Sequence, residues 1–133
     1  MFTLQQVKEA HGKVKTGADF PAYVREIKGL GLLTYEFRVA DGSVTYFGGN
    51  RYRVTDHARY EPLTINKVAS ADELRHVIAI HQQGQTDFLT FCRQAAAAGV
   101  EKWTVDTGKM VCSYLDKQQR VMVAEPIPDG DYI

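Results

Sequence analysis

The chain has 133 residues with a hydrophobic content of 44 %, and its 16 basic and 16 acidic side chains cancel. This is enough apolar material for one folded domain, but it provides no strong positive field to gather phosphates, so we expect no nucleic-acid partner. The N-terminal residues lack the pattern of a signal peptide, and no apolar run approaches the length of a membrane span. These features predict a cytoplasmic protein with no membrane partner.

Two helices are predicted at the start of the chain. Thr3 and Gln6 fit a capping box, in which each side chain satisfies a free backbone N–H group of the other residue. Apolar residues then recur at helical spacing over residues 4–14. Asp19 is expected to cap a second helix, and Gly31 is expected to end it, because helices commonly stop at a glycine.

Strands are predicted to follow these helices. Residues 35–39 alternate between apolar and polar side chains, which is the pattern of a half-buried strand. The Asp41-Gly42 pair predicts a two-residue hairpin turn, since both central residues of such a turn need positive φ. Further strands are expected at residues 44–47, 51–54 and, after a polar connection, 63–66.

The second half of the chain repeats this order of elements. The segment from Asp19 to Gly31 returns 68 residues later (87 − 19) as the segment from Asp87 to Gly99, with an arginine at the same place in both. The leading helix returns at an offset of 70 residues (81 − 11), and a change in loop length explains the difference. Strands are then expected near residues 102–106, 109–115 and 120–124.

We therefore predict an α+β fold made by tandem duplication of an α-α-β-β-β unit. The repeats should cover residues 3–54 and 70–125, with a connection at 55–69, in a single domain 1–133 whose irregular tail is 126–133. Four helices should cover one side of an antiparallel sheet, or of two half-sheets, about a pseudo-two-fold axis. Since an open sheet leaves its edge strands unpaired, a homodimer is a possible state.

Several segments of the chain carry a resemblance to a known family. They are residues 11–21, 46–48, 81–88 and 99–103. In these segments the chain resembles the YbcV-like family, a group of small bacterial proteins of unknown function, some of which are called phage envelope proteins. The resemblance covers most of the chain, up to about residue 125. It implies no activity, cofactor or catalytic residue.

The paired histidines are the first candidate functional feature. His11 and His81 occupy equivalent places at the ends of two apolar helical faces. If the repeats meet about a pseudo-two-fold axis, the two imidazoles could form a site between them. No metal is expected, but a metal held by this pair would need a third ligand from His57, Asp19 or Asp87. In the alternative interpretation, each histidine only bonds a free carbonyl at its helix end.

Two arginines form a second matched pair. Arg25 and Arg93 each lie six residues after an aspartate, Asp19 or Asp87. A guanidinium group binds carboxylate or phosphate through two parallel hydrogen bonds, so the pair could hold an anionic ligand. The alternative is that each aspartate caps its helix and each arginine is a solvated helix residue.

Aromatic residues on the predicted strands are the third candidate feature. Tyr46 and Trp103 represent this group, which could stack a flat ligand if it lay on an exposed face of the sheet. Packed beneath the helices, the same residues would belong to the core. The sequence leaves both interpretations open.

These observations predict an uncharacterised, non-catalytic module that binds a small molecule or another protein and needs no cofactor. The reason is a repeat fold with balanced charge and no motif specific to an enzyme. The two cysteines stand alone, so neither a zinc site nor a redox pair is expected. The alternatives are a small metal-dependent or histidine-based enzyme with its site between the repeats, and a phage-related structural protein. The candidate ligand-binding residues are His11, His81, Arg25, Arg93, Tyr46 and Trp103.

Overall fold

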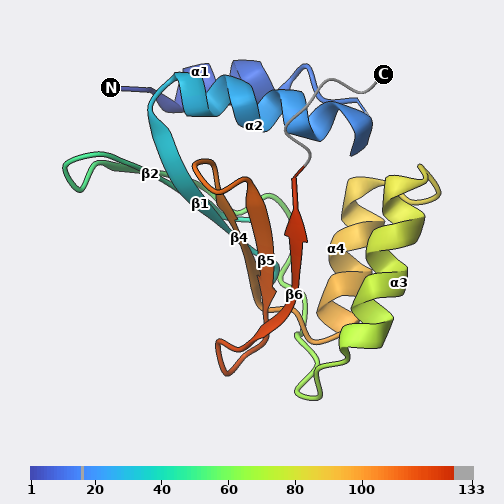
Figure 1. The fold of residues 1–133 in the computed structure, drawn as a ribbon. Helices are drawn as coiled ribbons and strands as arrows, with labels where there is room; N and C mark the ends of the chain where they lie inside the picture. Colours follow the sequence, from blue (N-terminus) through green and yellow to red (C-terminus); the bar gives the residue numbers. More distant parts are fainter. Residues whose placement is uncertain (16, 128–133) are drawn as a thin grey trace.

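The computed structural model describes residues 1–15 and 17–127, and it has the predicted α+β architecture. Four helices and six strands follow the order α-α-β-β-β twice (Figure 1). The first repeat contains α1 (Leu4–His11), the 3-10 helix η1 (Gly17–Asp19), α2 (Phe20–Gly29), β1 (Leu32–Arg38), β2 (Val44–Gly48) and β3 (Arg53–Asp56). The second contains α3 (Ala71–Gln82), α4 (Phe88–Ala97), β4 (Lys102–Asp106), β5 (Val111–Leu115) and β6 (Val121–Pro126).

All six strands form one antiparallel sheet, in the order β3-β2-β1-β4-β5-β6. The repeats therefore meet where β1 pairs with β4. In this pairing Glu36 lies opposite Thr104, and the two are separated by the same 68 positions (104 − 36) that relate the repeats. A residue that pairs with its own counterpart marks the position of a pseudo-two-fold axis. The predicted single sheet is correct, and the alternative of two half-sheets is not.

Both helix pairs pack on the same face of this sheet. Tyr23 of α2 contacts Tyr35 on β1, with 6.5 Å between the ring centroids, and Phe91 of α4 contacts Trp103 on β4 at 5.5 Å. Tyr35 and Trp103 point to the same side, because the register places Trp103 opposite Phe37, two residues along β1. Figure 1 shows α3 and α4 beside β6, at the right of the view. Helices α1 and α2 lie at the top of the view and run across the direction of the strands. No helix of the described residues is long and apolar enough to cross a membrane.

The opposite face of the sheet carries polar side chains. Lys102 Nζ lies 3.1 Å from Glu36 Oε1, and the Arg38 guanidinium donates hydrogen bonds to the hydroxyl oxygens of Ser43 and Thr45. An antiparallel sheet commonly has one face on the core and one face in water. The alternation predicted for β1 is therefore the alternation between these two faces.

Several predicted details are wrong, each for a local reason. The Asp41 turn is longer than two residues, since Arg38 N–H donates to Ser43 O across the loop. Asp19 does not cap α2 with its side chain, which instead accepts the Lys15 N–H at 2.9 Å. Residues 63–66 form no strand, because their backbone bonds to the β1–β2 turn and to the end of α4. Residue 126 belongs to β6, so the predicted tail starts later, and its residues 128–133 lie outside the described residues.

Candidate functional site

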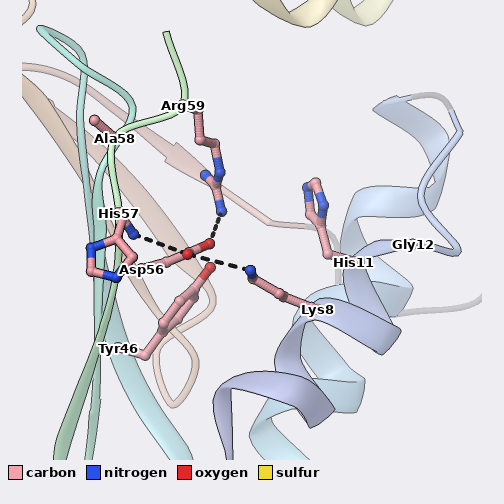
Figure 2. A pocket seen from close by; sticks show the side chains of 8 residues that line it. All are labelled: Lys8, His11, Gly12, Tyr46, Asp56, His57, Ala58 and Arg59. Carbon is pink, nitrogen blue, oxygen red and sulfur yellow. Dashed lines mark hydrogen bonds and ion pairs between the residues drawn. The ribbon is translucent and has the colours of Figure 1, made fainter.

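A polar cleft lies between the end of α1 and the end of β3. Its volume is about 530 Å³, and α1, β2 and the segment that follows β3 form its walls (Figure 2). The residues that line it are Lys8, His11, Gly12, Tyr46, Asp56, His57, Ala58 and Arg59. They come from the first repeat and from the segment that directly follows it, and none comes from the second repeat, so the cleft is not a site between the repeats.

Helix α1 brings Lys8 and His11 to the same side of the cleft. Thr3 and Gln6 form the predicted capping box, which sets the start of the helix. Val7 and Ala10 are buried against the sheet, so Lys8 and His11, which are three residues apart, share the neighbouring face. Because His11 is at the last position of the helix, the cleft faces the negative end of the helix dipole.

The opposite wall is held against the β1–β2 turn. Arg59 N–H donates to Asp41 O, and the Tyr60 hydroxyl donates to Val39 O at 2.6 Å. The Tyr60 ring covers Gly42 so closely that a Cβ on Gly42 would lie 2.7 Å from its Cε2 atom, and Gly42 also has φ +76°. This packing requires glycine at position 42, and it fixes the position of the backbone that carries Arg59.

Asp56 is the central acidic group of the cleft and is only 7 % exposed. Its carboxylate accepts hydrogen bonds from the His57 backbone N–H and from Arg59 Nη2, both at 2.9 Å, and Lys8 Nζ lies 3.4 Å away. Burial opposes ionisation, but the His57 amide and the charges of Arg59 and Lys8 outweigh it and lower the pKa of Asp56. Asp56 is therefore ionised at neutral pH and holds both cations at the cleft wall.

Tyr46 lines the cleft beside these charges, and the buried Tyr23 is its side-chain hydrogen-bond partner. Burial, reinforced by the neighbouring Tyr46, raises the pKa of Tyr23. Burial also raises the pKa of Tyr46, and the adjacent Arg59 guanidinium offsets this only in part. Both phenols are therefore neutral at physiological pH and can donate hydrogen bonds. Figure 2 shows the Tyr46 hydroxyl and the Lys8 ammonium converging on the Asp56 carboxylate.

His11 lies at the rim of the cleft, with its ring edge-on to the Tyr23 ring at 5.3 Å between centroids. Desolvation and the positive charge of Arg59 lower the pKa of His11, so its imidazole is neutral at pH 7. The His57 ring is turned away from Lys8 and His11 (Figure 2). Lys8, Arg59 and Asp56 together give the cleft two positive charges and one negative charge at neutral pH.

Two of the predicted site residues, His11 and Tyr46, line this cleft. His81 lies elsewhere: its ring stacks on Phe91 at 4.4 Å between centroids, and its Nδ1 lies 3.0 Å from Thr86 O. Trp103 is buried and stacks on Phe37 at 4.2 Å, as in the core interpretation of the aromatic residues.

The matched arginines also lie outside the cleft lining. Arg25 is half-buried on α2, and its Nη1 has no hydrogen-bond partner among the described residues. Arg93 is exposed on α4, while Asp87 caps that helix by accepting the Thr90 N–H at 2.8 Å. Within residues 1–15 and 17–127, no three His, Cys, Asp or Glu side chains are grouped as a metal site would require.

Sequence reasoning missed Lys8, Asp56 and Arg59. The available signal was the run Asp56-His57-Ala58-Arg59, which brings three ionisable side chains together directly after a strand. Residues placed at the end of a strand often form sites. Lys8 carried no signal, because a lysine on the polar face of a helix is ordinary.

The comparison with protein families decides where the chain belongs. The model of a family described as "Protein of unknown function (DUF1398)" matches residues 8–126. The chain belongs to the DUF1398 family. That match includes every residue that lines the cleft, while a search of the curated proteins finds no match.

Proposed function

We propose that this DUF1398 protein is a non-catalytic module that binds a small organic anion in the cleft between α1 and β3. The observation that carries this proposal is the arrangement of Lys8 and Arg59 around the single carboxylate of Asp56. Ligand sites are typically concave, with a few polar groups that fix the orientation of the ligand. The cleft combines that shape with an excess of positive charge and the phenol hydroxyl of Tyr46.

The state of its titratable groups supports binding rather than catalysis. Asp56 is ionised and bonded to Arg59, so its carboxylate is not available to remove a proton. Burial raises the pKa of Cys92 to about 11 and that of Cys112 to about 12, which suits inert thiols and not nucleophiles. Both thiols are free and buried, and this supports the proposal of a reducing, cytoplasmic location. We also propose that this chain belongs to the YbcV-like group, which it resembles in sequence.

A test of the binding site can use amide chemical shifts. Titration with sodium propionate should shift the amide signals of His11, Gly12 and Arg59 in a saturable way. Lys8→Ala removes an ammonium group that is half-exposed, so we expect propionate to bind about 3- to 10-fold more weakly. Lys13→Ala is the matched control, because Lys13 pairs with Glu26 and does not line the cleft. Shifts that are absent at all three cleft amides would refute the proposal.

A histidine-based enzyme is the second candidate, and the lowered pKa of His11 favours it. An imidazole that is neutral at pH 7 can accept a proton from a bound substrate. His11→Gln separates the two functions. Both functions predict that propionate binding survives in this variant, and only an enzyme predicts that turnover of its substrate is lost.

A further inference from the structure

The first observation is an aromatic side chain that remains exposed next to the core. Phe88, on the first turn of α4, is 44 % exposed. Its ring is edge-on to Phe37 at 5.4 Å and to Trp103 at 6.2 Å between centroids. Its counterpart in the first repeat, Phe20, is only partly buried too, but it packs against Tyr23 of its own helix. Phe88 instead presents an apolar surface above the centre of the sheet.

The second observation is that Arg59 joins this surface to the cleft. Its Cζ atom lies 5.9 Å from the centroid of the Phe37 ring, and its Nη2 donates to Asp56 inside the cleft. Phe37 is only 3 % exposed and contacts both Arg59 and Phe88. Arg59 and Phe88 therefore cover neighbouring parts of the same ring. A ligand that reaches from the cleft past Arg59 meets an aromatic surface.

The third observation concerns the charge that the cleft can accept. Lys8 and Arg59 exceed Asp56 by a single positive charge, and the C-terminal end of α1 adds a partial negative charge at His11. A singly charged carboxylate matches this balance. A phosphate dianion does not, because phosphate sites typically use the positive N-terminal end of a helix.

We propose that the ligand is an arylalkyl carboxylate. The carboxylate lies between Lys8 and Arg59, and the aryl ring packs against the exposed face of Phe88, with Arg59 between the two parts. This inference names the ligand class for the proposed function and rests on it. Lys8 and Arg59 supply the charge, and Phe88 selects a ligand with an aromatic body.

The experiment compares three probes by calorimetry and amide shifts: hydrocinnamate, propionate and phenyl phosphate. Hydrocinnamate should bind about 10-fold more tightly than propionate, because a phenyl ring buries apolar surface against Phe88. It should also bind more tightly than phenyl phosphate, which has the ring but a doubly charged head group.

Phe88→Ala supplies the matched variant. It should reduce the affinity for hydrocinnamate to nearly that for propionate and leave propionate binding unchanged. Leu89→Ala is the control, because Leu89 is the next residue of α4, is also exposed, and has no place in the proposed contact. If Phe88→Ala impairs folding, shifts of the Phe88 amide in the unaltered protein provide the same test, since hydrocinnamate should move it and propionate should not.

The outcomes separate this inference from the proposed function. Propionate that shifts the cleft amides while hydrocinnamate binds no better would overturn the aromatic assignment and leave the anion site intact. Tighter binding of phenyl phosphate would overturn the carboxylate assignment. If no probe shifts the cleft amides, the proposed function itself is wrong.

Discussion

In the first repeat, His11 lies edge-on to Tyr23 at the rim of an open cleft. In the second repeat its counterpart, His81, stacks flat on Phe91 and bonds to Thr86. The residues next to the two histidines also differ in polarity and exposure. Lys8 corresponds to Ile78 at the offset of the leading helices, and the Lys8 side chain is 53 % exposed where Ile78 is 3 % exposed.

The sheet beneath these two helix ends is nevertheless the same. In β2 and β3, Val44 pairs with Asp56, and in β5 and β6 the equivalent Cys112 pairs with Glu125. Asp56 accepts bonds from His57 and Arg59, whereas Glu125 accepts only a long bond of 3.4 Å from Gln82 among the described residues. Duplication therefore kept the pairing next to the helix ends, although β6 carries one extra residue farther along, while a few substitutions made one helix end polar and open and the other apolar and closed.

The largest expected effect comes from exchanging residues between the two helix ends. Ile78→Lys places an ammonium group in a buried site, so we expect it to lower the free energy of unfolding by about 3 kcal/mol or more. Lys8→Ile acts at an exposed site and should change it by less than about 0.5 kcal/mol. Urea denaturation at neutral pH measures both. Equal effects of the two variants would contradict the difference in burial between the repeats.

The second comparison concerns the two carboxylates. Asp56→Asn leaves Arg59 and Lys8 without their negative partner and should cost roughly 1–2 kcal/mol, reduced from the value for a fully buried pair because Arg59 is partly exposed. Glu125→Gln should cost less than about 0.5 kcal/mol. Since the pKa of Asp56 is lowered in the folded state, its stabilisation is present above the usual aspartate pKa and is lost as the pH falls through the folded value. Urea denaturation at acidic pH should therefore bring Asp56→Asn close to the unaltered protein.

Tyr23→Phe tests the buried tyrosine pair beside the cleft. It gives the first repeat the side chain that the second repeat has at the equivalent position, Phe91. Removing the buried hydroxyl takes away a partner of Tyr46, so we expect a loss of about 1 kcal/mol. Thermal denaturation measures this loss. Gln5→Ala is the control, because Gln5 is an exposed residue of α1. A stabilised Tyr23→Phe variant would show that the Tyr23 hydroxyl does not stabilise the fold.

The smallest expected effect is the pH dependence that arises from His11. Because its pKa is lowered on folding, the unfolded chain binds more protons, and stability should fall as the pH drops through the unfolded value of about 6.5 and level off below the folded value. His11→Gln should flatten this part of the profile, by less than about 1 kcal/mol. His76→Gln, at an exposed histidine of α3, is the control for the loss of an imidazole outside the cleft. A profile that is identical in all three proteins would contradict the shift at His11.

Much of the fold follows from local pattern. The capping residue Thr3, the alternation in β1 and the repeat offset predicted the helices, the strands and their duplication. The candidate site was less accessible. His11 and Tyr46 were identified from their matched positions and residue types, but His81, Arg25, Arg93 and Trp103 are equally matched and do not line the cleft.

The sequence alone thus determined the order of the elements and the existence of two repeats, because caps, glycine stops and side-chain alternation act over a few residues. It also determined the alternation of apolar and polar side chains along residues 35–39. Only the tertiary structure decided that Lys8 of the first helix faces Arg59, which follows the third strand. It also decided that Arg59 lies over the Phe37 ring, which in turn contacts the aromatic residues Phe88 and Trp103 of the second repeat. These contacts depend on how the segment after β3 packs against Gly42, and no local pattern encodes that packing.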